Sequence, residues 1–218
     1  IKAQSDMYSV IDMSRRAISN SALHMLSVAY VATQRSDAAS SLVLKHYKSS
    51  CNMTEKLQSL TDAVHLNLKC KDEILKNFEK DYSKNALAFD NYFRVQATVP
   101  DVSAVDNVNR LKEHPSYDGN NPNRVRALPG ALALSNPVAL NDISGRGYDL
   151  LCSEVQRLNS INPSVAARIL TPLLSFRRLD EKRQQMIRER LEKLKKLPSV
   201  SRSIYEKVES ALKESAEE

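Results

Sequence analysis

Glycine and tryptophan are scarce in this sequence, and their scarcity narrows the range of possible folds. The 218 residues include 4 glycines and no tryptophan, whereas glycine usually makes up about 7% of a protein. The tight turns of β-sandwiches and α/β sheets need glycine. No stretch alternates strictly between apolar and polar residues, as a half-buried strand would. These absences favour a fold built from helices.

Long apolar runs and an even number of cysteines are also missing. No run approaches the ~20 apolar residues needed to cross a bilayer, so we expect no membrane insertion. Cys51, Cys70 and Cys152 are odd in number and lack the spacing of a metal site. We expect three reduced thiols, buried or half-buried. Unpaired thiols favour an intracellular, cytoplasmic location.

The motifs of known active sites are absent as well. The histidines His24, His46, His65 and His114 do not form H-E-x-x-H or a similar metal-ligand spacing. The sequence contains no G-x-S-x-G, no Walker loop and no dinucleotide fingerprint. We therefore expect no catalytic residue, no metal ligand and no cofactor in this chain. His24 and His65 are expected on helices, as packing or surface residues.

Apolar residues recur at helical spacing along most of the chain. Ile18, Ala22, Leu26 and Ala29 follow one another at three- and four-residue steps, which predicts a helix with one apolar side. Similar patterns predict helices after Asn52, after Lys71, around Phe89 to Phe93, and from Ser103 to Glu113. We predict an all-α fold, an α-solenoid of paired antiparallel helices like armadillo or HEAT repeats. Residues 1–218 are expected to form a single helical domain.

Two kinds of local signal mark where helices begin and end. Asn52 is followed three residues later by Glu55, which predicts a capping box. Asn-Pro marks a helix start, because asparagine caps free N–H groups and proline fits the first turn. This pair occurs at Asn121, Asn136 and Asn162. Pro129-Gly130 is expected to end or kink the first of these helices, since a proline inside a helix costs about 3 kcal/mol.

The positive charge is concentrated in one segment. Residues 177–196 contain nine Lys or Arg and four Asp or Glu, in a chain whose formal net charge is +6. A nucleic-acid surface is one interpretation. We favour a solvated helix, because the segment has no aromatic residue to stack on bases and Glu189 is spaced to pair with Lys193. Its expected buried stripe is Leu179, Met186, Ile187, Leu191 and Leu194.

Arginines near two of the Asn-Pro pairs are harder to explain. If Asn121 and Asn162 cap helices, then Arg124, Arg126 and Arg168 lie in the first two turns. A positive charge there is unfavourable by about 0.3–1 kcal/mol. Each side chain is either exposed or paired with a carboxylate, or it points into a groove and binds carbonyls or carboxylates. The residues alone leave these alternatives open.

Several strings in the chain are similar to one known region. NPNRVRAL, SNP, DISGRGYDLL, NSINPSVAARILTPL and LDEKRQQMIRERLEKLK resemble the C-terminal region of the M1-family zinc metallo-aminopeptidases of the microbial aminopeptidase N type. CNMTEKLQSLTDAV and NYFRVQAT resemble the same region, so the likeness covers essentially all 218 residues. The resemblance implies a non-catalytic domain of a four-domain peptidase that removes N-terminal residues from peptides. It also implies that zinc and the catalytic residues belong to a separate domain, so this chain should be inert alone.

The same resemblance implies a role in controlling access. In this family the helical domain caps the catalytic cleft and leaves a cavity reached by a narrow channel, which admits short peptides. Arginines matching Arg126 and Arg168 line that cavity, and Arg124 and Ser164 are further candidates for substrate contacts. Ser164 stands where relatives often have a longer polar residue, and Pro129-Gly130 replaces an ordinary helical pair. The implied partners are the catalytic domain and short peptides, with no nucleic acid.

Two functions of other classes stay open. One is an independent helical-repeat scaffold that binds protein partners. The other is nucleic-acid binding through residues 177–196, which salt would weaken steeply.

Overall fold

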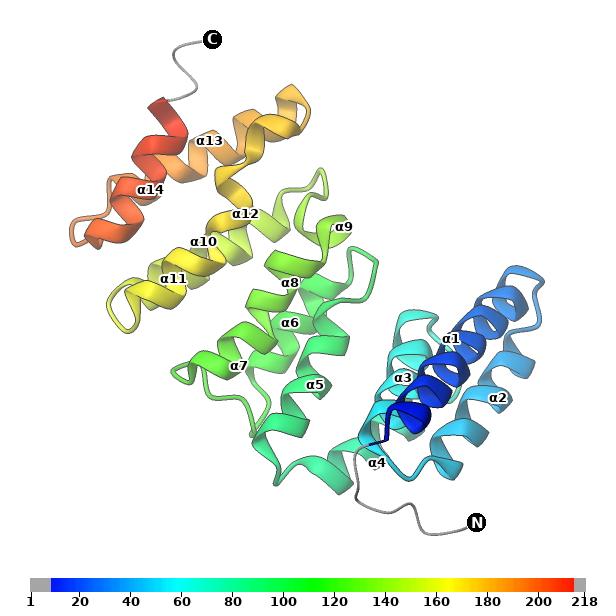
Figure 1. Cartoon of the computed structure of the whole chain (residues 1–218). Coiled ribbons are helices and arrows are strands. Elements are labelled where there is room, and N and C mark those ends of the chain that lie inside the picture. Colours follow the sequence, from blue (N-terminus) through cyan, green and yellow to red (C-terminus); the bar gives the residue numbers. More distant parts are fainter. Residues whose placement is uncertain (1–8, 214–218) are drawn as a thin grey trace. The chain divides into compact units, whose positions relative to one another are not determined.

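The computed structural model describes residues 9–213, and these residues are helical with no β-strand among them (Figure 1). The all-α prediction is therefore confirmed. The chain divides into two compact units, residues 1–88 and 89–218. The expected single domain over residues 1–218 stays a prediction. Within residues 9–213 no helix is long and apolar enough to cross a membrane.

Consecutive helices pack against each other within each unit. In the first unit α1 packs on α2, and α3 packs on α2 and α4; in the second, α10 packs on α11 and α13 on α14. The first unit contains α1 (Val10–Ala32), α2 (Ser36–Ser49), α3 (Met53–His65) and α4 (Lys71–Tyr82). Helix α5 (Ala86–Ala97) runs across the boundary between the units. The second unit continues with α6 (Ala104–Lys112), α7 (Pro122–Ala127), α8 (Pro129–Ser135), α9 (Pro137–Leu140), α10 (Arg146–Asn159), α11 (Pro163–Ile169), α12 (Thr171–Leu174), the 3-10 helix η1 (Phe176–Arg178), α13 (Glu181–Lys195) and α14 (Arg202–Lys213).

The predicted capping box lies at the start of α3. The backbone N–H of Glu55 donates to Oδ1 of Asn52 over 3.0 Å, as expected. The second bond differs from a standard capping box, because Oε2 of Glu55 accepts from the side-chain amide of Asn52 over 2.8 Å rather than from its backbone. The two side chains thus hold each other while one of them caps the helix.

All three Asn-Pro pairs begin helices, as predicted. Asn121, Asn136 and Asn162 are the N-caps of α7, α9 and α11, and in each case proline is the first helical residue. Asn136 has a second role: it is buried, and its amide donates to the carbonyls of Ala97 and Val99 over 3.0 and 2.7 Å. One side chain therefore starts α9 and satisfies carbonyls at and beyond the end of α5.

The first Asn-Pro helix ends immediately before Pro129-Gly130, as the sequence indicated. Helix α7 ends at Ala127, Leu128 leaves the helical conformation, and α8 starts at Pro129. Gly130 is where α8 approaches its neighbours: a Cβ atom there would lie 2.9 Å from the carbonyl oxygen of Val125 and 3.5 Å from Cγ2 of Ile169. Because a side chain at this position would press on the backbone of α7, glycine permits the close approach.

The predicted apolar stripe of α1 is wrong as a buried surface. Ile18, Ala22, Leu26 and Ala29 are exposed, and the residues that α1 buries are Asn20, Leu23 and Ser27. Helical spacing shows that a helix has an apolar side, but it does not show which side the neighbouring helices cover. Here α2 and α3 cover the more polar side of α1.

The helix predicted around Phe89 to Phe93 is confirmed as α5, and its aromatic residues form part of the core of the second unit. Phe89 stacks on Tyr92 with ring centroids 4.6 Å apart, and Phe93 contacts Phe89 edge-on at 5.3 Å. The rings of His114 and Tyr117, which follow α6, lie 5.6 and 5.8 Å from that of Phe93. His114 is thus a packing residue between an aromatic helix and a loop.

The three cysteines are free thiols in different environments. Cys70 is buried and Cys152 is half-buried, as expected, but Cys51 is exposed, so the prediction of three covered thiols was wrong for Cys51. Cys51 lies between the C-cap of α2, Ser50, and the N-cap of α3, Asn52.

Candidate functional site

Arg124 is the most constrained of the four candidate substrate-binding residues. It is 7% exposed, and its Nη1 lies 2.5 Å from Oδ1 of Asp90 on α5. Its guanidinium also lies over the rings of Phe89 and Phe93, 5.9 and 5.3 Å from their centroids. Arg124 therefore ties α7 to the aromatic core. The predicted substrate contact of Arg124 stays a prediction, and it would require the guanidinium to exchange Asp90 for a peptide.

Arg126 lies two residues further along α7 and is exposed. Its neighbours Val125 and Ala127 are buried, so the helix turns Arg126 towards solvent. Among residues 9–213 no hydrogen bond or ion pair engages its side chain. An arginine held at a fixed backbone position with its guanidinium accessible can bind a carboxylate or a carbonyl through two parallel N–H donors.

Arg168 and Ser164 share the solvent side of α11. They are four residues apart, which places them one turn apart on one side of the helix, and both are exposed. The opposite side, Val165, Ala166 and Ile169, is buried. Both are among the four predicted substrate contacts, and their role in binding stays a prediction.

Helix α8 brings the segments of Arg126 and Arg168 towards each other. It packs against both α7 and α11, and a Cβ atom at Gly130 would meet Val125 on one of them and Ile169 on the other. Val125 immediately precedes Arg126, and Ile169 immediately follows Arg168. The small residue at position 130 thus allows the two arginine-bearing helices to flank a single short helix.

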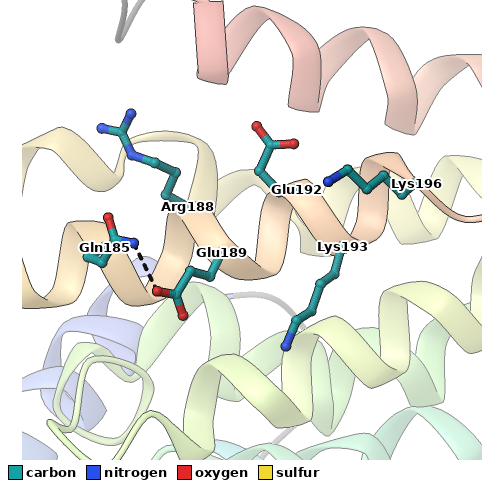
Figure 2. Close-up of a pocket in the computed structure, with 6 residues that line it drawn as sticks. All are labelled: Gln185, Arg188, Glu189, Glu192, Lys193 and Lys196. Atoms are coloured by element: carbon teal, nitrogen blue, oxygen red, sulfur yellow. Dashed lines mark hydrogen bonds between the residues drawn. The ribbon is translucent and has the colours of Figure 1, made fainter.

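The positively charged segment forms α13, and its charges are interleaved with acidic residues. A surface hollow of about 390 Å³ on this helix is lined by Gln185, Arg188, Glu189, Glu192, Lys193 and Lys196. Figure 2 shows these side chains in two rows, with Arg188, Glu192 and Lys196 in one and Gln185, Glu189 and Lys193 in the other. We expected Glu189 to pair with Lys193. In the structure, Oε1 of Glu189 instead accepts a hydrogen bond from Nε2 of Gln185 over 2.8 Å.

Other positive charges of this segment bind neighbouring elements. Arg190 forms a bidentate ion pair with Asp149 of α10: its Nε and Nη2 donate to the two carboxylate oxygens over 2.8 and 2.9 Å. Arg183 donates to the carbonyl of Asn141 over 2.6 Å, and Arg177 donates to the carbonyl of Ala211 over 3.1 Å. Arg190 thus links α13 to α10, Arg183 links α13 to the end of α9, and Arg177 links η1 to α14. Of the five residues of the predicted buried stripe, Ile187, Leu191 and Leu194 are buried, whereas Leu179 and Met186 are only half-buried.

The thiol of Cys152 lies in a second hollow, between α10 and α13. Burial raises the pKa of this thiol to about 12, and burial likewise raises the pKa of Cys70. Since the thiolate is the reactive form, both groups are poor nucleophiles at neutral pH. Their environment is that of packing residues.

Metal-binding residues do not gather in the described part of the chain. Within residues 9–213 no group of three or more His, Cys, Asp or Glu is placed to hold a metal ion. His24 contacts the buried Asp62, with Nδ1 2.7 Å from Oδ1, and His46 lies 2.8 Å from the hydroxyl of Ser59. The expectation that zinc belongs to a separate catalytic domain stays a prediction.

Sequence reasoning missed the acidic residues that organise both units. Glu154 is 1% exposed. Its Oε1 forms an ion pair with Nζ of Lys112, and its Oε2 lies 2.9 Å from Nη2 of Arg157. Asp62 and Asp90 are its counterparts on α3 and α5. Each of these carboxylates pairs with a residue far away in the sequence: Asp90 with Arg124, Asp62 with His24, and Glu154 with Lys112, at separations of 34 to 42 residues. Because these partners are distant in sequence, no local pattern could have identified the pairs.

Short helices that pack on their sequence neighbours define this chain as a helical-repeat domain. The sequence matches, over residues 2–213, the family described as a domain of unknown function (DUF3458_C) with ARM repeats. The chain belongs to this family of ARM-repeat domains. The predicted armadillo-like α-solenoid is therefore confirmed.

The similar proteins are aminopeptidases. The chain is 41% identical over 171 residues to aminopeptidase N of Haemophilus influenzae, covering 78% of this chain and 20% of that protein. It is 38% identical over 201 residues to aminopeptidase N of Escherichia coli, covering 92% of this chain and 22% of that protein. A solved structure, that of Legionella pneumophila aminopeptidase A in complex with aspartic acid, matches with a TM-score of 0.85 at 21% identity, covering 98% of this chain and 25% of that one. The chain thus spans about a fifth of its curated relatives, and the resemblance to the C-terminal part of aminopeptidase N is confirmed.

Proposed function

We propose that this chain is the non-catalytic, C-terminal helical domain of an M1-type zinc aminopeptidase that removes N-terminal residues from short peptides. The observation that carries the proposal is the match of nearly the whole chain to about a fifth of aminopeptidase N. In this division of labour the rest of the enzyme holds zinc and performs hydrolysis. The domain's partner is then the catalytic domain of the same intracellular, cytoplasmic protein.

The domain contributes shape and substrate contacts rather than chemistry. Arg126 and Arg168 have accessible guanidinium groups on helices anchored by buried residues, which suits them to bind a peptide carbonyl or its C-terminal carboxylate. Ser164 adds a hydroxyl one turn from Arg168. Arg124 acts through position, since its pair with Asp90 fixes the helix that carries Arg126.

Zinc content and peptide turnover test the division of labour. The isolated 218-residue chain is expected to bind no stoichiometric zinc and to release no amino acid from short peptides. The longer polypeptide that contains it is expected to hold zinc and to cleave the same peptides. Zinc is measured by atomic emission and turnover by amine release. Peptidase activity in the isolated chain, or a longer polypeptide without it, would contradict the proposal.

A further inference from the structure

Helix α1 exposes a row of large apolar side chains. Ile11, Ile18 and Met25 are 72%, 71% and 70% exposed. They recur every seven residues, so they lie above one another along one side of the helix. Ala22 and Ala29 are exposed between and beyond them on the same side. We call these five residues the α1 outer row.

The opposite side of α1 is the more polar one, and it is the side that the first unit covers. Asn20 and Ser27 are buried there, and within residues 9–213 Oδ1 of Asn20 and Oγ of Ser27 have no hydrogen-bond partner. His24 contacts the buried carboxylate of Asp62 across the same junction with α3. Burying polar groups while leaving apolar groups in water is unfavourable on both counts. Such a helix is suited to contact other helices on two sides.

Helix α14 provides an internal comparison. Its buried side is apolar, with Ile204, Val208 and Ala211. Its exposed side carries charge, including Arg202 paired with Glu206 over 2.6 Å. Repeat proteins need terminal helices with a polar outer surface. The outer side of α14 meets this requirement, whereas the α1 outer row does not.

We infer that the α1 outer row is the docking surface for a further amphipathic helix of the longer polypeptide. This inference rests on the proposed function, since the aminopeptidase relatives are about five times as long as the matched segment and so contain polypeptide that can supply such a helix. A large residue every seven positions, with Ala22 between Ile18 and Met25 and Ala29 one turn further on, is the pattern of two helices packed at a shallow angle. Arg15, between Ile11 and Ile18, is the one charged residue along this side; it pairs with Asp12 over 3.4 Å. The alanines allow close approach. From Ile11 to Ala29 the row extends about 27 Å, which a partner helix of about five turns would match.

The test combines one double variant with two chain lengths. I18D/M25D places two charges in the α1 outer row. The matched control is Leu87→Asp, because Leu87 on α5 is equally exposed, at 73%, and lies outside the row. Amide hydrogen exchange of α1 is measured by mass spectrometry, both in the longer polypeptide and in the 218-residue chain. Sedimentation gives the oligomeric state of each.

The expected result differs between the two chains. In the longer polypeptide the double variant accelerates exchange of the α1 amides at least ten-fold and the Leu87→Asp control changes it less than two-fold. In the 218-residue chain neither variant changes it more than two-fold. If the double variant prevents folding, Ile18→Ala is used, with an expected acceleration of several-fold in the longer polypeptide only.

Two results would overturn the inference. One is unchanged exchange of α1 in the longer polypeptide, which would mean that the row stays in water. The other is a dimer of the longer polypeptide that the double variant converts to monomer, which would mean that a second copy covers the row. Peptide turnover, measured in the same samples, reports on the proposed function separately, because a variant can lose the helix contact while the catalytic domain still cleaves peptides.

Discussion

Asn136 shows how much one buried side chain contributes in this fold. It caps α9 and donates to two carbonyls near the end of α5. Asn136→Ala is expected to lower the free energy of unfolding by about 2–4 kcal/mol, since it removes a cap and leaves buried carbonyls without donors. Asn121→Ala, which removes an exposed cap of the same type, is expected to cost about 1 kcal/mol. Urea denaturation followed by circular dichroism measures both. Equal losses would show that the α5 contacts of Asn136 contribute nothing.

The thiols lead to a prediction about chemical reactivity. Burial raises the pKa of Cys152 to about 12 and also raises that of Cys70, so at pH 8 the thiolate fraction of both is small. Cys51 is exposed. Iodoacetamide at pH 8 is expected to modify Cys51 first, and to modify Cys70 and Cys152 at comparable rates only after denaturation. Peptide mass spectrometry over a time course measures the order, and early modification of Cys152 would contradict it.

Gly130 allows the close packing of α8 against α7 to be tested. A Cβ atom there would lie 2.9 Å from the carbonyl oxygen of Val125, which is backbone and cannot move without displacing α7. Gly130→Ala is therefore expected to lower the free energy of unfolding by about 1–3 kcal/mol, as overpacking typically does. Ala131→Gly is the comparison, with an expected loss of about 1 kcal/mol from helix propensity. Unchanged or increased stability of Gly130→Ala would show that α8 does not depend on this approach.

The starts of the helices could be read from the sequence, but their packing could not. Asn-Pro and Pro-Gly act through the backbone within a few residues, so Asn121, Asn136, Asn162 and Pro129 were placed correctly. The stripe of α1 was assigned to the wrong environment, because the covered side depends on which helices lie next to it. The same limit applies to Arg124: its position in the first turn was predictable, but its burial against Asp90, 34 residues away, was not.

At the scale of the whole molecule, the charge on α13 leads to a prediction about nucleic acids. Arg177, Arg183 and Arg190 bind neighbouring elements. In the hollow on α13, Arg188, Lys193 and Lys196 are interleaved with Glu189 and Glu192. The chain is therefore expected to bind single-stranded RNA or duplex DNA weakly, without a micromolar complex at 50 mM salt. Fluorescence anisotropy with labelled oligonucleotides measures this. Tight binding that falls steeply with salt would support the nucleic-acid alternative.

The accessible arginines of this domain are proposed to contact the peptide that another domain cleaves. The most direct test is the KM of the longer enzyme for peptides of two to six residues, with Arg126→Ala, Arg168→Ala and both together. Arg202→Ala on α14 is the control, since that guanidinium is exposed and paired with Glu206. KM is expected to rise about ten-fold or more for peptides that reach the arginines, because a hydrogen bond to a charged group contributes about 1.5–3 kcal/mol, while the melting temperature stays unchanged. KM values equal to those of the unmodified enzyme at every peptide length would contradict the claim.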